Sequence, residues 1–193
     1  MRQASASRST KETEIKVFLN LDGSGKSLID TGVGFFDHML DLLAFHSGYD
    51  LEVKARGDLH VDDHHTIEDI GILMGKLFSQ AIGDKKGIQR YGSFRMPMDE
   101  TLAAVDLDIS GRPYLVFLAE FSRDMVGGMS TEMTEEFLRA FAFNAGITLH
   151  VEILHGKNDH HKMEAIFKAL GRALAQASEV TSNRVVSSKG VLE

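Results

Sequence analysis

The sequence contains no cysteine, and only two of its 193 residues are proline. Without cysteine there can be no disulfide bond and no thiolate ligand, so any metal site has to use histidine and carboxylate side chains. The same absence is consistent with the cytoplasm, which we take as the expected location. With so few prolines and no low-complexity tract, the chain shows no linker, and the one candidate seam lies near residues 84–95.

Long hydrophobic runs are also missing. No apolar stretch approaches the roughly 20 residues that a membrane span needs, and the N-terminal segment MRQASASRST lacks the apolar core of a signal peptide. The formal net charge of −7 argues against nucleic acid as a partner. We therefore expect neither a membrane nor a nucleic-acid partner, and the length suits one domain or two small fused halves.

The most informative feature that is present is a doubled motif, HH-x-x-E. It occurs once as His64, His65 and Glu68, and again as His160, His161 and Glu164. Further positions match at the same offsets in the two copies, namely Gly75/Gly171, Lys76/Arg172, Gln80/Gln176 and Ala81/Ala177. Self-similarity of this kind indicates an internal duplication.

The repeat extends upstream of the motif. A loop two residues shorter before the second motif pairs Leu51 with Leu149, Gly48 with Gly146 and His38 with Glu136. Each unit then consists of a helix, a strand, a turn and a second helix that starts at HH. We predict a single domain, residues 1–193, made of two pseudo-repeats that cover roughly residues 1–90 and 91–193.

Hydrophobic periodicity predicts an alternation of strands and helices. Strands are expected at residues 14–20, 27–31, 50–55, 101–109, 114–120 and 147–154, and helices at 36–46, 66–82, 132–144 and 161–177. The Asp22–Gly25 segment is predicted to be a hairpin turn, with residues 27–31 as the returning strand. Because no Rossmann glycine pattern is present, we expect an α+β fold in which each half packs a sheet on helices.

The geometry of a helix divides the residues of the doubled motif between two ions. The first histidine and the glutamate are four positions apart, so they share one face of a helix and can share an ion. The second histidine lies about 100° around the helix and points toward another ion. His64 with Glu68 is therefore expected to form half of one site, and His160 with Glu164 half of the other.

The duplication supplies the remaining ligands. By pseudo-symmetry His161 completes the first site and His65 the second, and the repeat nominates His38 and Glu136 as one more ligand for each. Glu136 also has a simpler interpretation, as part of the acidic first turn of a helix. Imidazole and carboxylate together suit Mn, Fe, Zn, Co or Ni better than Ca or Mg.

A further group of residues would bind an anion if they converged on one place. Arginine offers a planar fork for phosphate, and lysine offers a point charge. The candidates are Arg90, Arg112, Lys168 and the segment Ser187–Lys189. Taken singly, each is an ordinary solvated surface residue. His46 ends a predicted helix, where it either reaches the site or only interacts with the helix dipole.

Several segments together resemble one family, imidazoleglycerol-phosphate dehydratase. They are TGVGFFDHMLDLLAFH, GDLHVDDHHTIEDIGI, KKGIQRYGSFRMPMDETL, DLDISGRPYL, GKNDHHKMEAIFKALGRAL and SSKGVLE. The resemblance covers nearly the whole chain and leaves no room for the phosphatase domain that is fused to some members. It implies a duplicated α+β fold related to the second domain of ribosomal protein S5. It also implies a hollow particle of 24 subunits, with two Mn(II) ions per active site at subunit contacts.

The resemblance also implies roles for individual residues. One ion would be bound by His38, His65, His160 and Glu164, and the other by His64, Glu68, Glu136 and His161, in agreement with the division made from helix geometry. The family position at Glu136 is often histidine, so this ligand departs from the pattern. The implied substrate contacts are Glu12, His38, His46, His64, His65, Glu68, Arg90, Arg112, His160, Lys168, Ser187, Ser188 and Lys189.

The implied reaction is the dehydration of imidazoleglycerol phosphate to imidazole acetol phosphate, a step of histidine biosynthesis. Two Mn(II) ions on the two ring nitrogens would stabilise an imidazolate form of the substrate, which can expel the neighbouring hydroxyl. A carboxylate must move protons; Glu12 is the candidate, with Glu164 as the alternative. The HH-x-x-E pairs alone would also permit a di-metal hydrolase of phosphate esters or amides, or a shell protein that stores metal.

Overall fold

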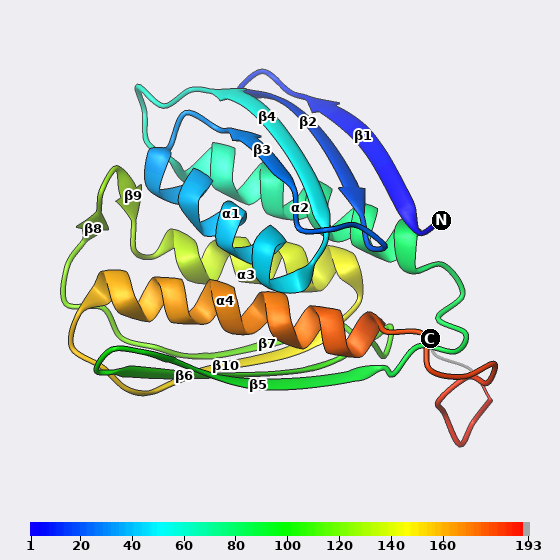
Figure 1. Ribbon diagram of the computed structural model, residues 1–193. Helices are drawn as coiled ribbons and strands as arrows, with labels where there is room; N and C mark the ends of the chain where they lie inside the picture. The colour runs from blue at the N-terminus through cyan, green and yellow to red at the C-terminus, as the bar shows by residue number, and fades with distance from the viewer. Residues whose placement is uncertain (191–193) are drawn as a thin grey trace.

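The computed structural model describes residues 1–190, in which four helices lie between two four-stranded sheets (Figure 1). The first half contains β1 (Gln3–Ser9), β2 (Thr13–Asn20), β3 (Ser27–Asp30), α1 (Gly34–Ser47), β4 (Asp50–Gly57) and α2 (His64–Ile82). The second half contains β5 (Tyr91–Met98), β6 (Thr101–Asp108), β7 (Tyr114–Leu118), α3 (Met133–Ala145), β10 (Thr148–His155) and α4 (Asp159–Ser178). A short hairpin, β8 (Met125–Val126) and β9 (Met129–Ser130), is inserted before α3.

The two halves have the same topology. Their sheets are ordered β1-β2-β4-β3 and β5-β6-β10-β7. In each sheet the first three strands are antiparallel, and the last strand, β3 or β7, runs parallel to its neighbour. This confirms the predicted α+β fold with two similar halves of sheet on helices.

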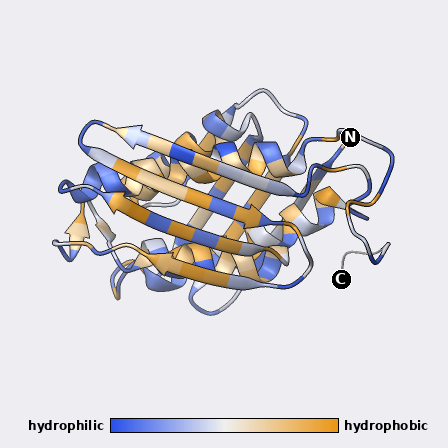
Figure 2. Ribbon diagram, turned by 90° about the horizontal axis from the view of Figure 1, so that it is seen from below, coloured by the Kyte–Doolittle hydropathy of each residue, from blue (hydrophilic) through white to orange (hydrophobic). Residues whose placement is uncertain are grey.

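The strands follow the alternation of apolar and polar residues. On β2, Ile15, Val17 and Leu19 are buried while the residues between them are more exposed, as in a strand with one face on the core. Hydrophilic and hydrophobic residues also alternate along the strands of the second sheet (Figure 2). The inner faces of both sheets and all four helices contribute to one buried hydrophobic cluster.

The prediction of a hairpin at Asp22–Gly25 is wrong. β3 does not return along β2 but pairs with β4 in parallel, and β2 lies between β1 and β4. The turn is instead held against the start of β4, because an oxygen of the Asp50 carboxylate accepts the backbone N–H groups of Ser24 (2.8 Å) and Lys26 (3.1 Å). The sequence analysis also missed β1 and β5, which occupy the sheet edges.

The matched glycines of the repeat have physical explanations. Gly48 and Gly146 end α1 and α3 in the left-handed conformation (φ 75° and 67°), which suits a helix C-terminus. Gly75 and Gly171 lie where helices of opposite halves cross. A Cβ at Gly75 of α2 would meet the backbone oxygen of Phe141 on α3 at 2.5 Å. The duplication therefore conserves the packing of α2 on α3 and of α4 on α1.

All four helices begin at the same end of the molecule, on the left in Figure 1, while both ends of the chain lie on the right. The helix N-termini, and with them both HH-x-x-E motifs, are therefore gathered at one end. Among the residues described, no helix is both long and apolar enough to cross a membrane.

Candidate metal centre

The packing of α4 on α1 brings together three of the predicted ligands. His38 comes from α1, and His160 and Glu164 come from the first turns of α4. Glu164 Oε1 lies 2.7 Å from His38 Nε2 and 3.5 Å from His160 Nε2. Within residues 1–190, this is the only group of at least three histidine or acidic side chains whose donor atoms all lie within 4.8 Å of one another. The group is a candidate metal centre with a nitrogen and carboxylate donor set.

Glu164 is held as a buried carboxylate in this group. Only 6% of the residue is exposed, and its second oxygen, Oε2, accepts a hydrogen bond from Lys168 Nζ at 2.9 Å. Burial alone would raise the pKa of Glu164, but the hydrogen bonds from Lys168 and His38 outweigh it and lower the pKa below its usual value. The charged form that a metal ion requires is therefore the form favoured at neutral pH.

The pseudo-symmetric group on α2 is less complete. His64 Nε2 lies 4.0 Å from Glu68 Oε2, on one face of the helix as predicted from their spacing. Glu136 on the neighbouring α3 is paired instead with Arg139, at 2.9 Å between Oε1 and Nη1. Within the described chain, Glu136 is not brought into a ligand group with His64 and Glu68.

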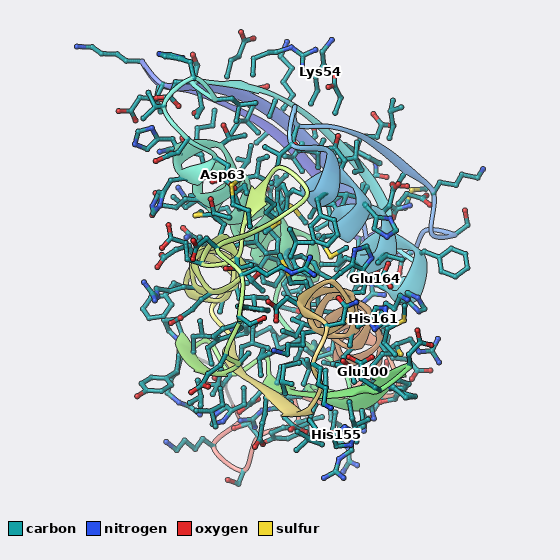
Figure 3. All side chains as sticks on the ribbon, turned by 90° about the vertical axis from the view of Figure 1, so that its left-hand side faces the viewer. Lys54, Asp63, Glu100, His155, His161 and Glu164 are labelled. Atoms are coloured by element: carbon teal, nitrogen blue, oxygen red, sulfur yellow. The ribbon has the colours of Figure 1, made fainter. Side chains whose placement is uncertain are left out.

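The second histidine of each motif makes different contacts from the first. His65 Nδ1 lies 3.0 Å from Asp58 Oδ2, and 4.0 Å from Glu12 Oε2. His161 Nδ1 lies 2.7 Å from Glu100 Oε2. Figure 3 looks at the end where the helices begin and shows His161 between Glu164 and Glu100. Among the residues that the structure describes, neither His65 nor His161 belongs to a three-residue ligand group.

Hydrogen bonds at these contacts shift the pKa values of Glu100 and His65. Backbone hydrogen bonds, chiefly from Asn158, and the contact with His161 hold the pKa of Glu100 far below its usual range. The hydrogen bond with Asp58 raises the pKa of His65. Sequence reasoning missed both Asp58 and Glu100, because neither belongs to the repeated motif.

The aspartate before each HH pair connects the start of its helix to the segment that precedes α3. Asp63 accepts hydrogen bonds from Ser130 N and Oγ, both at 2.7 Å. Asp159 accepts from Ser122 N and Oγ, both at 2.8 Å, and is paired with Lys162 at 2.9 Å. Both aspartates therefore anchor the segment around β8 and β9 to the end where the candidate ligands lie. The repeated D-H-H was visible in the sequence and was overlooked.

Most candidate anion-binding residues lie elsewhere in the chain. The Arg90 backbone N–H bonds to Ala177 O at the end of α4, and its side chain forms a two-pronged contact with Asp108 and also donates to Val186 O. Arg90 and the segment 187–190 thus lie at the opposite end from the helix N-termini (Figure 1). Arg112 is exposed in the turn after β6. Of this set, only Lys168 touches the group that contains Glu164.

His46 lies on the same helix pair as that group. Its Cβ would be 3.1 Å from a Cβ added at Gly171, where α1 crosses α4. Burial and the nearby charges of Lys168 and Arg172 lower its pKa, which favours the neutral ring. His46 therefore lies along the α1–α4 crossing, beyond Lys168.

The fold and the site together define the class of this protein. It is a mixed α+β protein in which two sheets flank paired helices, and a candidate metal centre of two histidines and a glutamate lies at the helix N-termini. Comparison with known proteins identifies the family. The sequence model of the family described as imidazoleglycerol-phosphate dehydratase matches residues 31–174. The imidazoleglycerol-phosphate dehydratase of Clostridioides difficile (strain 630) is 57% identical over 192 residues, covering 100% of both chains.

Solved structures agree. The crystal structure of imidazoleglycerol-phosphate dehydratase from Staphylococcus aureus is 47% identical, with a TM-score of 0.84 over 93% of this chain and 99% of that one. The enzyme from Pyrococcus furiosus is 38% identical, with a TM-score of 0.85 over 97% of this chain and 100% of that one. The chain belongs to the imidazoleglycerol-phosphate dehydratase family, which confirms the resemblance found in the sequence. It is a dehydratase, and so a carbon–oxygen lyase.

Proposed function

We propose that this chain converts D-erythro-imidazoleglycerol phosphate to imidazole acetol phosphate in histidine biosynthesis, using two Mn(II) ions per active site. Family membership supports the substrate and the reaction. The observation that supports the metal chemistry is the His38, His160 and Glu164 group, whose donor atoms converge from two helices. We take the cytoplasm as the location, as for a biosynthetic enzyme.

The side chains fit manganese by their chemistry. Imidazole nitrogen and carboxylate oxygen are donors that Mn(II) accepts, and the chain has no thiolate that would favour a softer metal. His38, His160 and Glu164 would hold one ion, and His65 of a neighbouring copy of the chain would complete this ligand set. His64, Glu68, Glu136 and His161 are the corresponding residues for the other ion. When bound, the two ions would act as Lewis acids on the substrate imidazole and favour its imidazolate form.

The protein's own groups then bind and move protons. Glu12 is the candidate proton shuttle, because its carboxylate is 54% exposed and ends 4.0 Å from Nδ1 of His65, a candidate metal ligand. Glu164 is the alternative, but Lys168 and His38 already occupy its two oxygens. Lys168, the arginines and the Ser187–Lys189 segment would bind the phosphate, remote from the reacting carbons, and so supply binding energy.

A complete site needs more than one chain under this proposal. The His38 group lies at one end of the molecule, whereas Arg90 and Ser187–Lys189 lie at the other (Figure 1). The side chains of His38 and His160 are 46% and 44% exposed, so they remain open to residues of a neighbouring copy. We propose self-assembly, into a particle of 24 subunits as in the family, with a small phosphate substrate and neither nucleic acid nor membrane as partner.

One assay tests the proposal. Purified protein is incubated with Mn(II) and imidazoleglycerol phosphate, and both ketone and inorganic phosphate are measured. Ketone formation without phosphate release is the expected result. Phosphate release would show a hydrolase instead, and binding of metal without turnover would show a protein that only stores metal.

A further inference from the structure

The two halves of the molecule hold the second histidine of each motif with carboxylates from different places. In the first half, His65 Nδ1 contacts Asp58, in the loop between β4 and α2. In the second half, His161 Nδ1 contacts Glu100, in the turn between β5 and β6. Because the halves share one topology, this exchange of partners can be traced residue by residue.

Glu100 has a counterpart in the first half, namely Glu12. Glu12 directly precedes Thr13, the buried first residue of β2, just as Glu100 precedes Thr101, the buried first residue of β6. The two turns therefore carry the same Glu-Thr pair at the same point of the topology. Yet Glu100 lies 2.7 Å from its histidine, whereas Glu12 lies 4.0 Å from His65 and is 54% exposed.

Asp58 has a counterpart too, and that counterpart is a lysine. The β10–β6 ladder shifts by one residue at a bulge, so Gly156 takes the place of Gly57 beside the buried threonine, and Lys157 takes the place of Asp58. A lysine side chain has no hydrogen-bond acceptor, and the backbone N–H of Lys157 itself donates to Glu100. The second half therefore has to hold its histidine from the β5–β6 turn. In the first half Asp58 does so, which leaves Glu12 free.

Glu100 is itself fixed in orientation. Its Oε1 accepts the backbone N–H groups of Asn158 (2.8 Å) and Lys157 (3.0 Å), and Oε2 is the oxygen that faces His161 Nδ1. An ionised carboxylate can only accept hydrogen bonds. Nδ1 of His161 therefore carries the proton, and in the neutral ring the lone pair is on Nε2.

We propose that Glu100 and Asp58 are positioning residues that fix the Nδ1–H tautomers of His161 and His65, so that each ring presents Nε2 to a metal ion. Because Asp58 orients His65, Glu12, the counterpart of Glu100, remains available to the substrate. This inference rests on the proposed metal-dependent function. It adds two residues that act through the ligands without touching metal or substrate.

Glu100→Gln tests the inference with little disturbance of the fold. The amide oxygen of the glutamine accepts the N–H groups of Lys157 and Asn158, as Oε1 of Glu100 does. Its NH₂ group therefore faces His161. A donor at that place favours the opposite tautomer, with the proton on Nε2, which cannot then bind a metal. Mn(II) titration of the assembled protein by calorimetry should show two sites in the wild type. In the variant, one of the two should bind about 10- to 100-fold more weakly, while the other should keep its wild-type affinity.

Asp99→Asn is the matched control. Asp99 Oδ2 lies 3.6 Å from the other nitrogen of His161, so this change also removes one negative charge beside the ring but does not face Nδ1. Its side chain is 74% exposed, and Mn(II) affinity should fall at most about fivefold, as for an exposed charge pair. Equal weakening in the two variants would show an effect of charge alone and would overturn the inference.

Asp58→Ala extends the test to the other half. It removes the acceptor of His65 Nδ1, so it should weaken one ion, and the double variant with Glu100→Gln should weaken both. Two tight sites in Glu100→Gln would overturn the tautomer proposal and leave the proposed function standing. A wild-type protein that binds no Mn(II) would overturn both.

Discussion

Gly171 on α4 lies so close to Leu43 on α1 that an added Cβ would meet the Leu43 backbone oxygen at 2.8 Å. The same helix pair supplies His38, His160 and Glu164, so the distance between the candidate ligands depends on this close approach. Gly171 therefore allows the close helix approach that brings the three candidate ligands together.

Gly171→Ala is expected to lower the free energy of unfolding by about 1–3 kcal/mol, because the methyl group forces the helices apart. Alanine is otherwise the better helix former by roughly 1 kcal/mol, so a loss of stability would be due to the crowding. Urea denaturation measures the change. Gly34→Ala, in the first turn of α1, is the control, because nothing lies within 4 Å of its added Cβ. A variant at position 171 as stable as the wild type would contradict this account.

Asp159→Asn should destabilise the protein in a pH-dependent way. Burial acts to raise the pKa of Asp159, but hydrogen bonds from Lys162 and Ser122 outweigh it, and the net pKa is lowered. A lowered folded-state pKa gives stability that is present above the unfolded pKa, about 3.9, and lost as the pH falls through the folded pKa. At pH 7 we expect a loss of roughly 1.5–3 kcal/mol, as for hydrogen bonds to a charged group. The difference from the wild type should shrink below about pH 4; a constant difference from pH 7 to pH 3 would refute the linkage.

His65→Ala and His161→Ala should each remove a different ion. Each of these histidines lies about 100° around its helix from the first histidine of its motif. His65 is therefore expected to bind the ion of His160 and Glu164, and His161 the ion of His64 and Glu68. Metal analysis of the assembled single variants should show about half of the wild-type manganese, and the double variant should lose both ions. If the double variant retained as much metal as either single variant, the crossed assignment of ligands would be wrong. His150→Ala, on a strand of the second sheet, should leave the metal content unchanged.

Lys189→Ala should raise KM and leave bound metal unchanged. The default expectation for Ser187–Gly190 is a solvated tail, but its hydroxyl, ammonium and backbone N–H groups are all donors for a phosphate. Losing one charge-assisted contact costs roughly 1.5–3 kcal/mol, or about 10- to 150-fold in kcat/KM. Lys54→Ala, an exposed residue of β4 in the first sheet (Figure 3), is the control. Unchanged kinetics in a chain truncated after Val186 would show that the segment takes no part in binding.

The sequence predicted the helices well, because each buries a face whose spacing is visible in the chain. The strand pairing was predicted less well. β1 contains no large apolar residue. In β5 the residues Phe94, Met96 and Met98 do alternate toward the core, but Pro97 interrupts the segment and argues against a strand. The partner of β3 depends on Asp50, far along the chain, and not on the turn that precedes the strand.

The candidate site shows the same limit. The doubled motif predicted which histidine and glutamate share a helix face, and the structure places His160 and Glu164 together with His38, which the repeat had also nominated. Asp58 and Glu100 escaped prediction because a hydrogen bond between separate elements leaves no spacing pattern in the sequence. The assignment of His65, His161 and Glu136 to particular ions stays a prediction, since the ligands would come from more than one chain.

The unequal turns at Glu12 and Glu100 have a consequence for how such a molecule can change over time. In a symmetric pair of identical half-length chains, one codon would specify both turns, and a carboxylate recruited for catalysis in one would be recruited in the other. Joining the halves in a single chain gives each turn its own codon. The position after β1 and the position after β5 can then be selected for different roles. Their glutamates already differ, because Glu100 contacts His161 at 2.7 Å whereas Glu12 lies 4.0 Å from His65.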